Sequence, residues 1–86
     1  MAVFIISYDL RKPDFDYEAL YGALAELGAE HVQDSVWGLN IEWSAREVFD
    51  YLWQHMHYQK DRLFVVTFDK EKPYRSQNDM KNLIDF

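Results

Sequence analysis

An aspartate ends the first apolar segment of the chain, and its carboxylate is the side chain best suited to chemistry. Asp9 closes the β-branched and aromatic stretch Ala2–Asp9, and the sequence up to Pro13 stops the strand. A carboxylate held at the end of a rigid strand can bind Mg²⁺ or Mn²⁺, which prefer oxygen ligands and keep several waters. Asp9 could instead simply end the strand or pair with Arg11, so one aspartate alone does not decide between these interpretations.

A two-metal nuclease needs more than one carboxylate. Asp14 and Asp16 follow closely, but acids just before a helix are usually caps. If two subunits pair about a twofold axis near this strand end, two copies of Asp9 could share one metal. Substrate oxygens and water would then complete its coordination.

The other candidate groups give weaker patterns. His55 and His57 are two residues apart on an expected helix and point to different faces, so they do not form a metal pair. His31 begins an expected strand close to Gly28 and is a candidate acid–base residue. Ser35 has neither a nearby triad partner nor a glycine elbow, which argues against a nucleophilic role.

Basic residues lie in three places along the chain. Arg11 and Lys12 stand beside Asp9, and Arg46 lies on an expected helix. Six of the nine bases fall in residues 60–81, where the net charge is +2. This segment could face phosphate, or it could be a solvated turn and tail.

Composition limits the classes of function. A chain of 86 residues forms one domain, and the absence of cysteine excludes disulfides and thiolate chemistry. The apolar run Ala2–Ile6 is too short for a membrane span or a signal-peptide core, so we expect a soluble, cytoplasmic protein without a membrane partner. A net charge of −6 makes nonspecific nucleic-acid binding poor, and any such role needs a local basic patch, a metal or a partner protein.

Hydrophobic periodicity predicts the elements that position these residues. Apolar spacings of three and four predict a helix over Tyr17–Leu27, which Asp14 or Asp16 caps and Gly28 ends. The stretch Glu30–Glu42 is strand-like, with bend or bulge points at residues 34–35 and at Gly38. It forms either a hairpin or one kinked strand.

A second helix and a last strand complete the domain. Ser44 and Glu47 form a capping box that starts a helix running from Ala45 to about His57. The apolar stretch Leu63–Asp69 predicts the last buried strand.

This order predicts an α+β, ferredoxin-like βαββαβ domain over residues 1–69. Its four-stranded antiparallel sheet has strand order 4-1-3-2 and carries both helices on one face. Fifteen aromatic residues exceed what a small core needs. We therefore expect a homodimer in which the second subunit covers the sheet face without helices. Residues 70–86 form a tail that we expect to pack on the partner subunit.

Three segments in this order resemble a known family. The stretch Val3–Leu10, with Tyr8 and Asp9, resembles the first strand of the small CRISPR-associated protein that accompanies the integrase, the second universal Cas protein. Gly28–Trp37 resembles that family's Gly-x-Arg-Val-Gln-x-Ser-Val-Phe segment, and Asp61–Val66 resembles its last core strand. The resemblance covers about residues 2–69, and VapD-like toxins share the fold.

The resemblance implies a homodimer that is either a nuclease or a non-catalytic binding protein. Members are described as metal-dependent endoribonucleases or DNases, or as non-catalytic dimers that bridge integrase subunits and duplex DNA. The family's metal-binding aspartate matches Asp9, and Tyr8, Ser35 and Trp37 also align. His31 stands where the family has arginine, which removes a permanent positive charge.

The leading hypothesis is therefore a Mg²⁺- or Mn²⁺-dependent endonuclease acting on RNA or DNA. The resemblance implies that Asp9 binds the metal and that Tyr8 and Ser35, which align with the family, complete the catalytic set. The expected nucleic-acid contacts are Arg11, Lys12, His31, Trp37, Arg46 and Arg62. One alternative is a non-catalytic dimer that binds nucleic acid or an integrase-like protein through Arg46 and the bases of residues 60–81. Another is a protein-interaction module that uses its aromatic surface.

Overall fold

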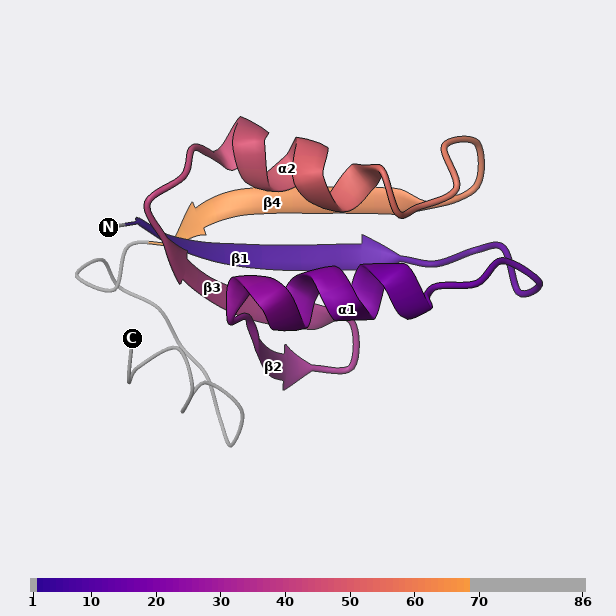
Figure 1. Cartoon of the computed structure of the whole chain (residues 1–86), viewed down its shortest axis with the longest axis horizontal. Helices are drawn as coiled ribbons and strands as arrows, with labels where there is room; N and C mark the ends of the chain where they lie inside the picture. Colours follow the sequence, from indigo (N-terminus) through magenta and orange to yellow (C-terminus); the bar gives the residue numbers. More distant parts are fainter. Residues whose placement is uncertain (1, 69–86) are drawn as a thin grey trace.

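The computed structural model describes residues 2–68 of the chain. The predicted role of the tail, residues 70–86, lies outside the described residues, as does the predicted strand end at Asp69. The elements are β1 (Ala2–Asp9), α1 (Glu18–Leu27), β2 (Glu30–Gln33), β3 (Val36–Ile41), α2 (Ala45–Trp53) and β4 (Arg62–Phe68) (Figure 1).

The four strands form one antiparallel sheet in the order β2-β3-β1-β4. This order confirms the predicted ferredoxin-like topology. β1 lies between β3 and β4, in agreement with its mostly apolar sequence. The stretch after α1 is a hairpin, with its turn at residues 34–35 and a register irregularity between His31 and Gln33. Gly38 lies inside β3 and does not bend the strand out of the sheet.

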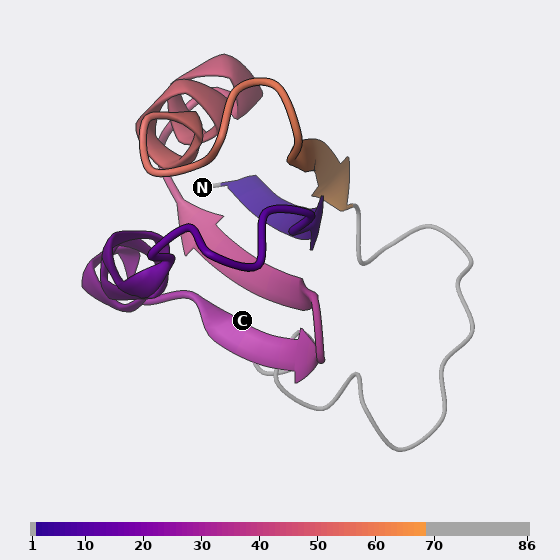
Figure 2. The ribbon, with the colours of Figure 1, turned by 90° about the vertical axis from the view of Figure 1, so that its right-hand side faces the viewer.

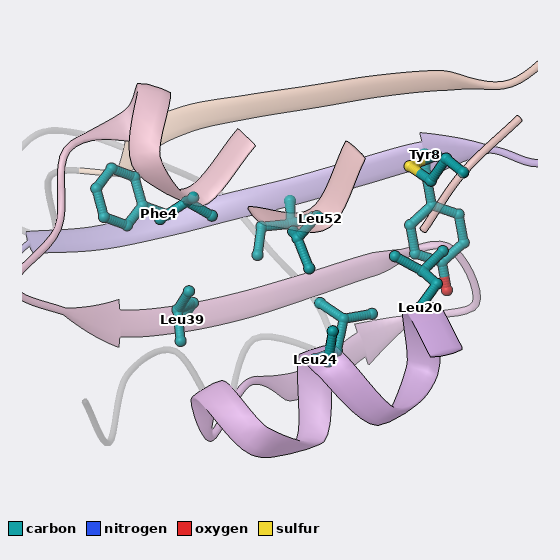
Figure 3. Close-up of a cluster of buried hydrophobic side chains, with 10 residues drawn as sticks. Phe4, Tyr8, Leu20, Leu24, Leu39 and Leu52 are labelled. Atoms are coloured by element: carbon teal, nitrogen blue, oxygen red, sulfur yellow. The ribbon is translucent and has the colours of Figure 1, made fainter. Parts of the chain in front are cut away.

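Both helices cover the same face of the sheet (Figure 2). Alternate residues of β1 point toward them, because successive side chains of a strand lie on opposite faces. Figure 3 shows the resulting core, in which strand side chains meet leucines of both helices. The buried apolar residues are Phe4, Ile6, Tyr8, Leu20, Ala23, Leu24, Leu39, Val48, Leu52 and Met56.

The start of α2 confirms the predicted capping box. The Ser44 hydroxyl accepts a hydrogen bond from the Glu47 amide at 3.1 Å, and the Glu47 carboxylate accepts one from the Ser44 amide at 3.0 Å. The helix ends at Trp53, earlier than the predicted His57. In a continued helix the His57 amide would donate within the helix, but here it donates to the Asp61 carboxylate.

The start of α1 differs from the prediction. Its N-cap residue is Tyr17, which makes no side-chain capping bond, so neither predicted aspartate occupies that position. Asp16 still accepts a hydrogen bond from the Glu18 amide at 2.9 Å. The Tyr17 hydroxyl instead bonds to Asp61, a residue 44 positions away. At the other end Gly28 has φ 80°, which confirms the predicted left-handed C-cap.

The sheet face opposite the helices, called here the opposite face, carries the other half of the strand side chains. In β1 these include Ile5, Ser7 and Asp9, and in β4 they include Phe64 and Val66. Phe64 is 62% exposed and Val66 is 39% exposed. The opposite face therefore presents apolar side chains next to the carboxylate of Asp9.

Candidate functional site

Asp9 lies at the end of β1, as predicted, and its side chain is 53% exposed. Its neighbour Tyr8 points toward the helices, so alternation along the strand places Asp9 on the opposite face. Arg62 is its cross-strand partner in β4, and directly opposed residues of an antiparallel pair lie on the same face. The Arg11 Nε lies 3.0 Å from Asp9 Oδ2. The carboxylate therefore has an arginine on the following loop and another on the neighbouring strand.

A shallow hollow of about 310 Å³ lies along this pair of strand ends. It combines a carboxylate, a guanidinium group, a hydroxyl and an exposed aromatic ring within one short stretch of sheet. The lining residues are Ser7, Tyr8, Asp9, Arg62, Leu63 and Phe64.

A divalent metal fits Asp9 only in part. Residues 2–68 contain no group of three or more histidine or acidic side chains placed to hold an ion. Mg²⁺ is commonly bound through one or two carboxylates, with substrate phosphates and waters completing its shell. Asp9 has that chemistry, since it is an exposed carboxylate at the end of a buried strand. One subunit would thus supply a single carboxylate to an ion, and substrate or a second Asp9 would have to supply further ligands.

Tyr8 and Trp37 form a separate pair on the helix side of the sheet. Trp37 Nε1 donates to the Tyr8 hydroxyl at 2.9 Å, and Tyr8 is only 9% exposed. Burial raises the pKa of Tyr8, while the bond from Trp37 acts in the opposite sense. The His31 ring stacks on Trp37 with centroids 4.3 Å apart. The structure therefore brings these three aromatic residues together, but on the face away from the Asp9 carboxylate.

Ser35 lies in the turn between β2 and β3. Its backbone carbonyl accepts a hydrogen bond from the Tyr8 amide at 3.1 Å. This contact places the turn beside the end of β1. It gives Ser35 a structural link to the strand that carries Asp9.

Two of the predicted nucleic-acid contacts make ion pairs of their own. Lys12 Nζ lies 2.9 Å from Asp14, and this bond lowers the pKa of the Asp14 carboxyl. Arg46 is 90% exposed on α2 and lies 3.6 Å from Asp50. α2 begins near the end of the sheet where β1 starts (Figure 1). Arg46 is the second residue of α2 and Asp9 is the last residue of β1, so the two lie at opposite ends of the domain.

Asp61 is the residue of this region that the sequence did not indicate as functional. It is buried, with 6% exposure, and lies directly before β4. Its Oδ1 accepts hydrogen bonds from the Arg11 amide at 2.8 Å and from the Tyr17 hydroxyl at 2.6 Å. Its Oδ2 accepts one from the His57 amide at 2.8 Å. The carboxylate therefore ties the loop after β1 to the loop before β4.

The bond between Asp61 and Tyr17 changes the pKa of both side chains. Burial alone would raise the pKa of Asp61, but the hydrogen bonds from Tyr17, Arg11 and His57 together lower it. Burial and the bond to Asp61 raise the pKa of Tyr17 to about 12. The sequence signal for Asp61 is an aspartate directly before an apolar strand, but only the fold shows which groups its carboxylate binds.

Comparison with models of known protein families found no match, and comparison with solved structures found none. No helix within residues 2–68 is long and apolar enough to cross a membrane.

Proposed function

We propose that this protein is a homodimeric, metal-dependent endonuclease that hydrolyses a phosphodiester bond of RNA or DNA at Asp9. The observation that supports this most is the position of Asp9. Its exposed carboxylate lies at the end of a central strand, with Arg11 in contact and Arg62 opposite. The sequence resemblance described above implies the same residue for the metal.

The residues present have distinct roles in this proposal. Asp9 would hold the ion, and a bound Mg²⁺ or Mn²⁺ would stabilise the charge that develops on the phosphoryl oxygens. Arg11 and Arg62 orient the phosphate, because a guanidinium group can donate two parallel hydrogen bonds to it. Lys12 adds a further positive charge on the same loop.

A second subunit completes the site in this proposal. Described residues of one chain contribute one aspartate to the hollow at Asp9, and a twofold axis near it would supply another. The exposed Phe64 and Val66 lie on the same face and provide apolar area for such contact. Pairing through the opposite face would bring two Asp9 carboxylates close to one substrate.

The test is cleavage of labelled RNA and DNA oligonucleotides by the purified protein with Mg²⁺, Mn²⁺ or a chelator. Asp9→Asn should lower the rate by roughly a hundredfold or more, because loss of even an outer metal partner costs up to that much. Asp50→Asn is the matched control, since Asp50 is also an exposed acid paired with an arginine. Cleavage that survives both the chelator and Asp9→Asn would refute the proposal.

A second candidate is a non-catalytic module that binds the nucleic-acid backbone. The Asp9–Arg11 ion pair favours it, because an aspartate already bonded to arginine helps to place that arginine for phosphate. In this case the wild type binds oligonucleotides without cutting them. Arg11→Ala and Arg62→Ala should each weaken binding and reduce its salt dependence by about one counterion.

A further inference from the structure

Asp61 fixes the backbone of the residues that place positive charge near Asp9. The Arg11 amide donates to Asp61 Oδ1 at 2.8 Å, and the Arg11 side chain continues to Asp9 Oδ2 at 3.0 Å. The Tyr17 hydroxyl, which donates to Asp61, accepts a bond from the Lys12 amide at 3.3 Å. One buried carboxylate thus sets the backbone positions of both Arg11 and Lys12.

The same carboxylate also fixes the second loop at this end of the sheet. The His57 amide donates to Asp61 Oδ2, and the His57 ring packs edge-on against Phe15 at 5.7 Å between centroids. Phe15 in turn lies 5.0 Å from the Tyr17 ring. The loop that carries Arg11 is therefore held at its backbone by Asp61 and at its far side by aromatic packing.

A buried carboxylate is costly unless its oxygens are hydrogen-bonded. All three bonds that Asp61 accepts come from loops beside the sheet end, and one of the donors is the Arg11 amide. We propose that Asp61 is a positioning residue that holds the Arg11 guanidinium against Asp9. The role rests on the proposed function, in which this pair meets phosphate, but the pairing can be measured without any substrate.

The experiment follows the ¹⁵Nε–¹Hε signal of Arg11 by NMR in the full-length protein without substrate. Asp9→Asn gives the reference position for an Arg11 side chain that has lost its ionic partner. Asp61→Asn should move the signal at least halfway to that reference. If this variant does not fold, Asp61→Glu keeps the charge, changes the reach of the carboxylate and should move the signal in the same direction.

Tyr17→Phe is the matched control. It removes the bond to Asp61 and the bond from the Lys12 amide, but it leaves the bond from the Arg11 amide to Asp61 in place. It should lower stability while the Arg11 signal stays near its wild-type position. A folded Asp61 variant with the wild-type Arg11 signal would overturn the proposal. An equal shift in Tyr17→Phe would also overturn it, because general loosening of the loops would explain both. If the wild type cuts no oligonucleotide but the signal responds as stated, the proposed nuclease fails and the positioning role stands.

Discussion

At the level of single residues, the Asp61 carboxyl makes the stability of the fold depend on pH. Its folded pKa is lowered, whereas an aspartate in an unfolded chain titrates near pH 3.9, about the usual value. The unfolded chain therefore binds a proton more readily in acid. The stability that Asp61 contributes is present above about pH 4 and is lost as the pH falls through the lower folded pKa.

Asp61→Asn should therefore be less stable near neutral pH and less sensitive to acid. We expect a loss of roughly 1–3 kcal/mol in the free energy of unfolding, since buried donors lose a charged acceptor. Urea unfolding at a series of acidic pH values gives the slope for both proteins. Parallel curves for wild type and variant would contradict the role assigned to Asp61.

Sequence alone could predict the position of Asp9 but not its surroundings. Strand periodicity places Tyr8 and Asp9 on opposite faces, and the structure confirms this. The bonds to Asp61 span up to 50 positions, so no local pattern contains them. The stacking of His31 on Trp37 likewise depends on the register between β2 and β3.

Among the elements, both helix boundaries that the sequence missed involve Asp61. Propensity predicted an aspartate cap for α1, but the N-cap residue is Tyr17, whose hydroxyl is bound to Asp61. Periodicity extended α2 to His57, but the His57 amide is also bound to Asp61. The capping box at Ser44 and the glycine cap at Gly28 were predictable, because each motif is complete within a few residues.

The two glycines of the α1 region give a matched test of helix geometry. Gly22 lies inside α1, and an added Cβ meets no atom within 4 Å. Gly22→Ala should raise the free energy of unfolding by roughly 0.5–1 kcal/mol, because alanine loses less backbone entropy. Gly28→Ala should lower it by about 1 kcal/mol, since φ 80° is strained for alanine.

Chemical denaturation of the two variants beside the wild type measures both changes. Their opposite signs separate backbone conformation from the effect of an added methyl group, which has open space at both sites. Stabilisation by both substitutions would show that residue 28 does not hold the left-handed conformation in solution.

For the whole molecule, chain order and the handedness of the crossovers were enough to predict the sheet order and the side that the helices cover. Sequence pattern does not say what meets the opposite face, because the same exposed apolar residues suit several partners. Phe64 and Val66 are the described side chains that best report on this contact.

Phe64→Lys should weaken the proposed dimer. An aromatic residue at the centre of an interface commonly contributes about 2 kcal/mol, which corresponds to roughly a 30-fold change in Kd. Sedimentation equilibrium over a range of concentrations measures this change. Tyr58→Lys is the control, because Tyr58 is 73% exposed but lies on the loop between α2 and β4. Equal association of the wild type and Phe64→Lys would place any dimer contact elsewhere.

The most direct measurement of metal binding at Asp9 is a thermal melt with and without millimolar Mn²⁺. A ligand that binds only the folded form stabilises it, by about 2.7 kcal/mol at a hundredfold excess over Kd. Wild type and Asp50→Asn should therefore melt at higher temperature with Mn²⁺. Asp9→Asn should show no shift. In the proposed dimer it should also be at least as stable as the wild type without metal, because two facing carboxylates would repel each other. Equal shifts in wild type and Asp9→Asn, or no shift in either, would contradict a metal site at Asp9.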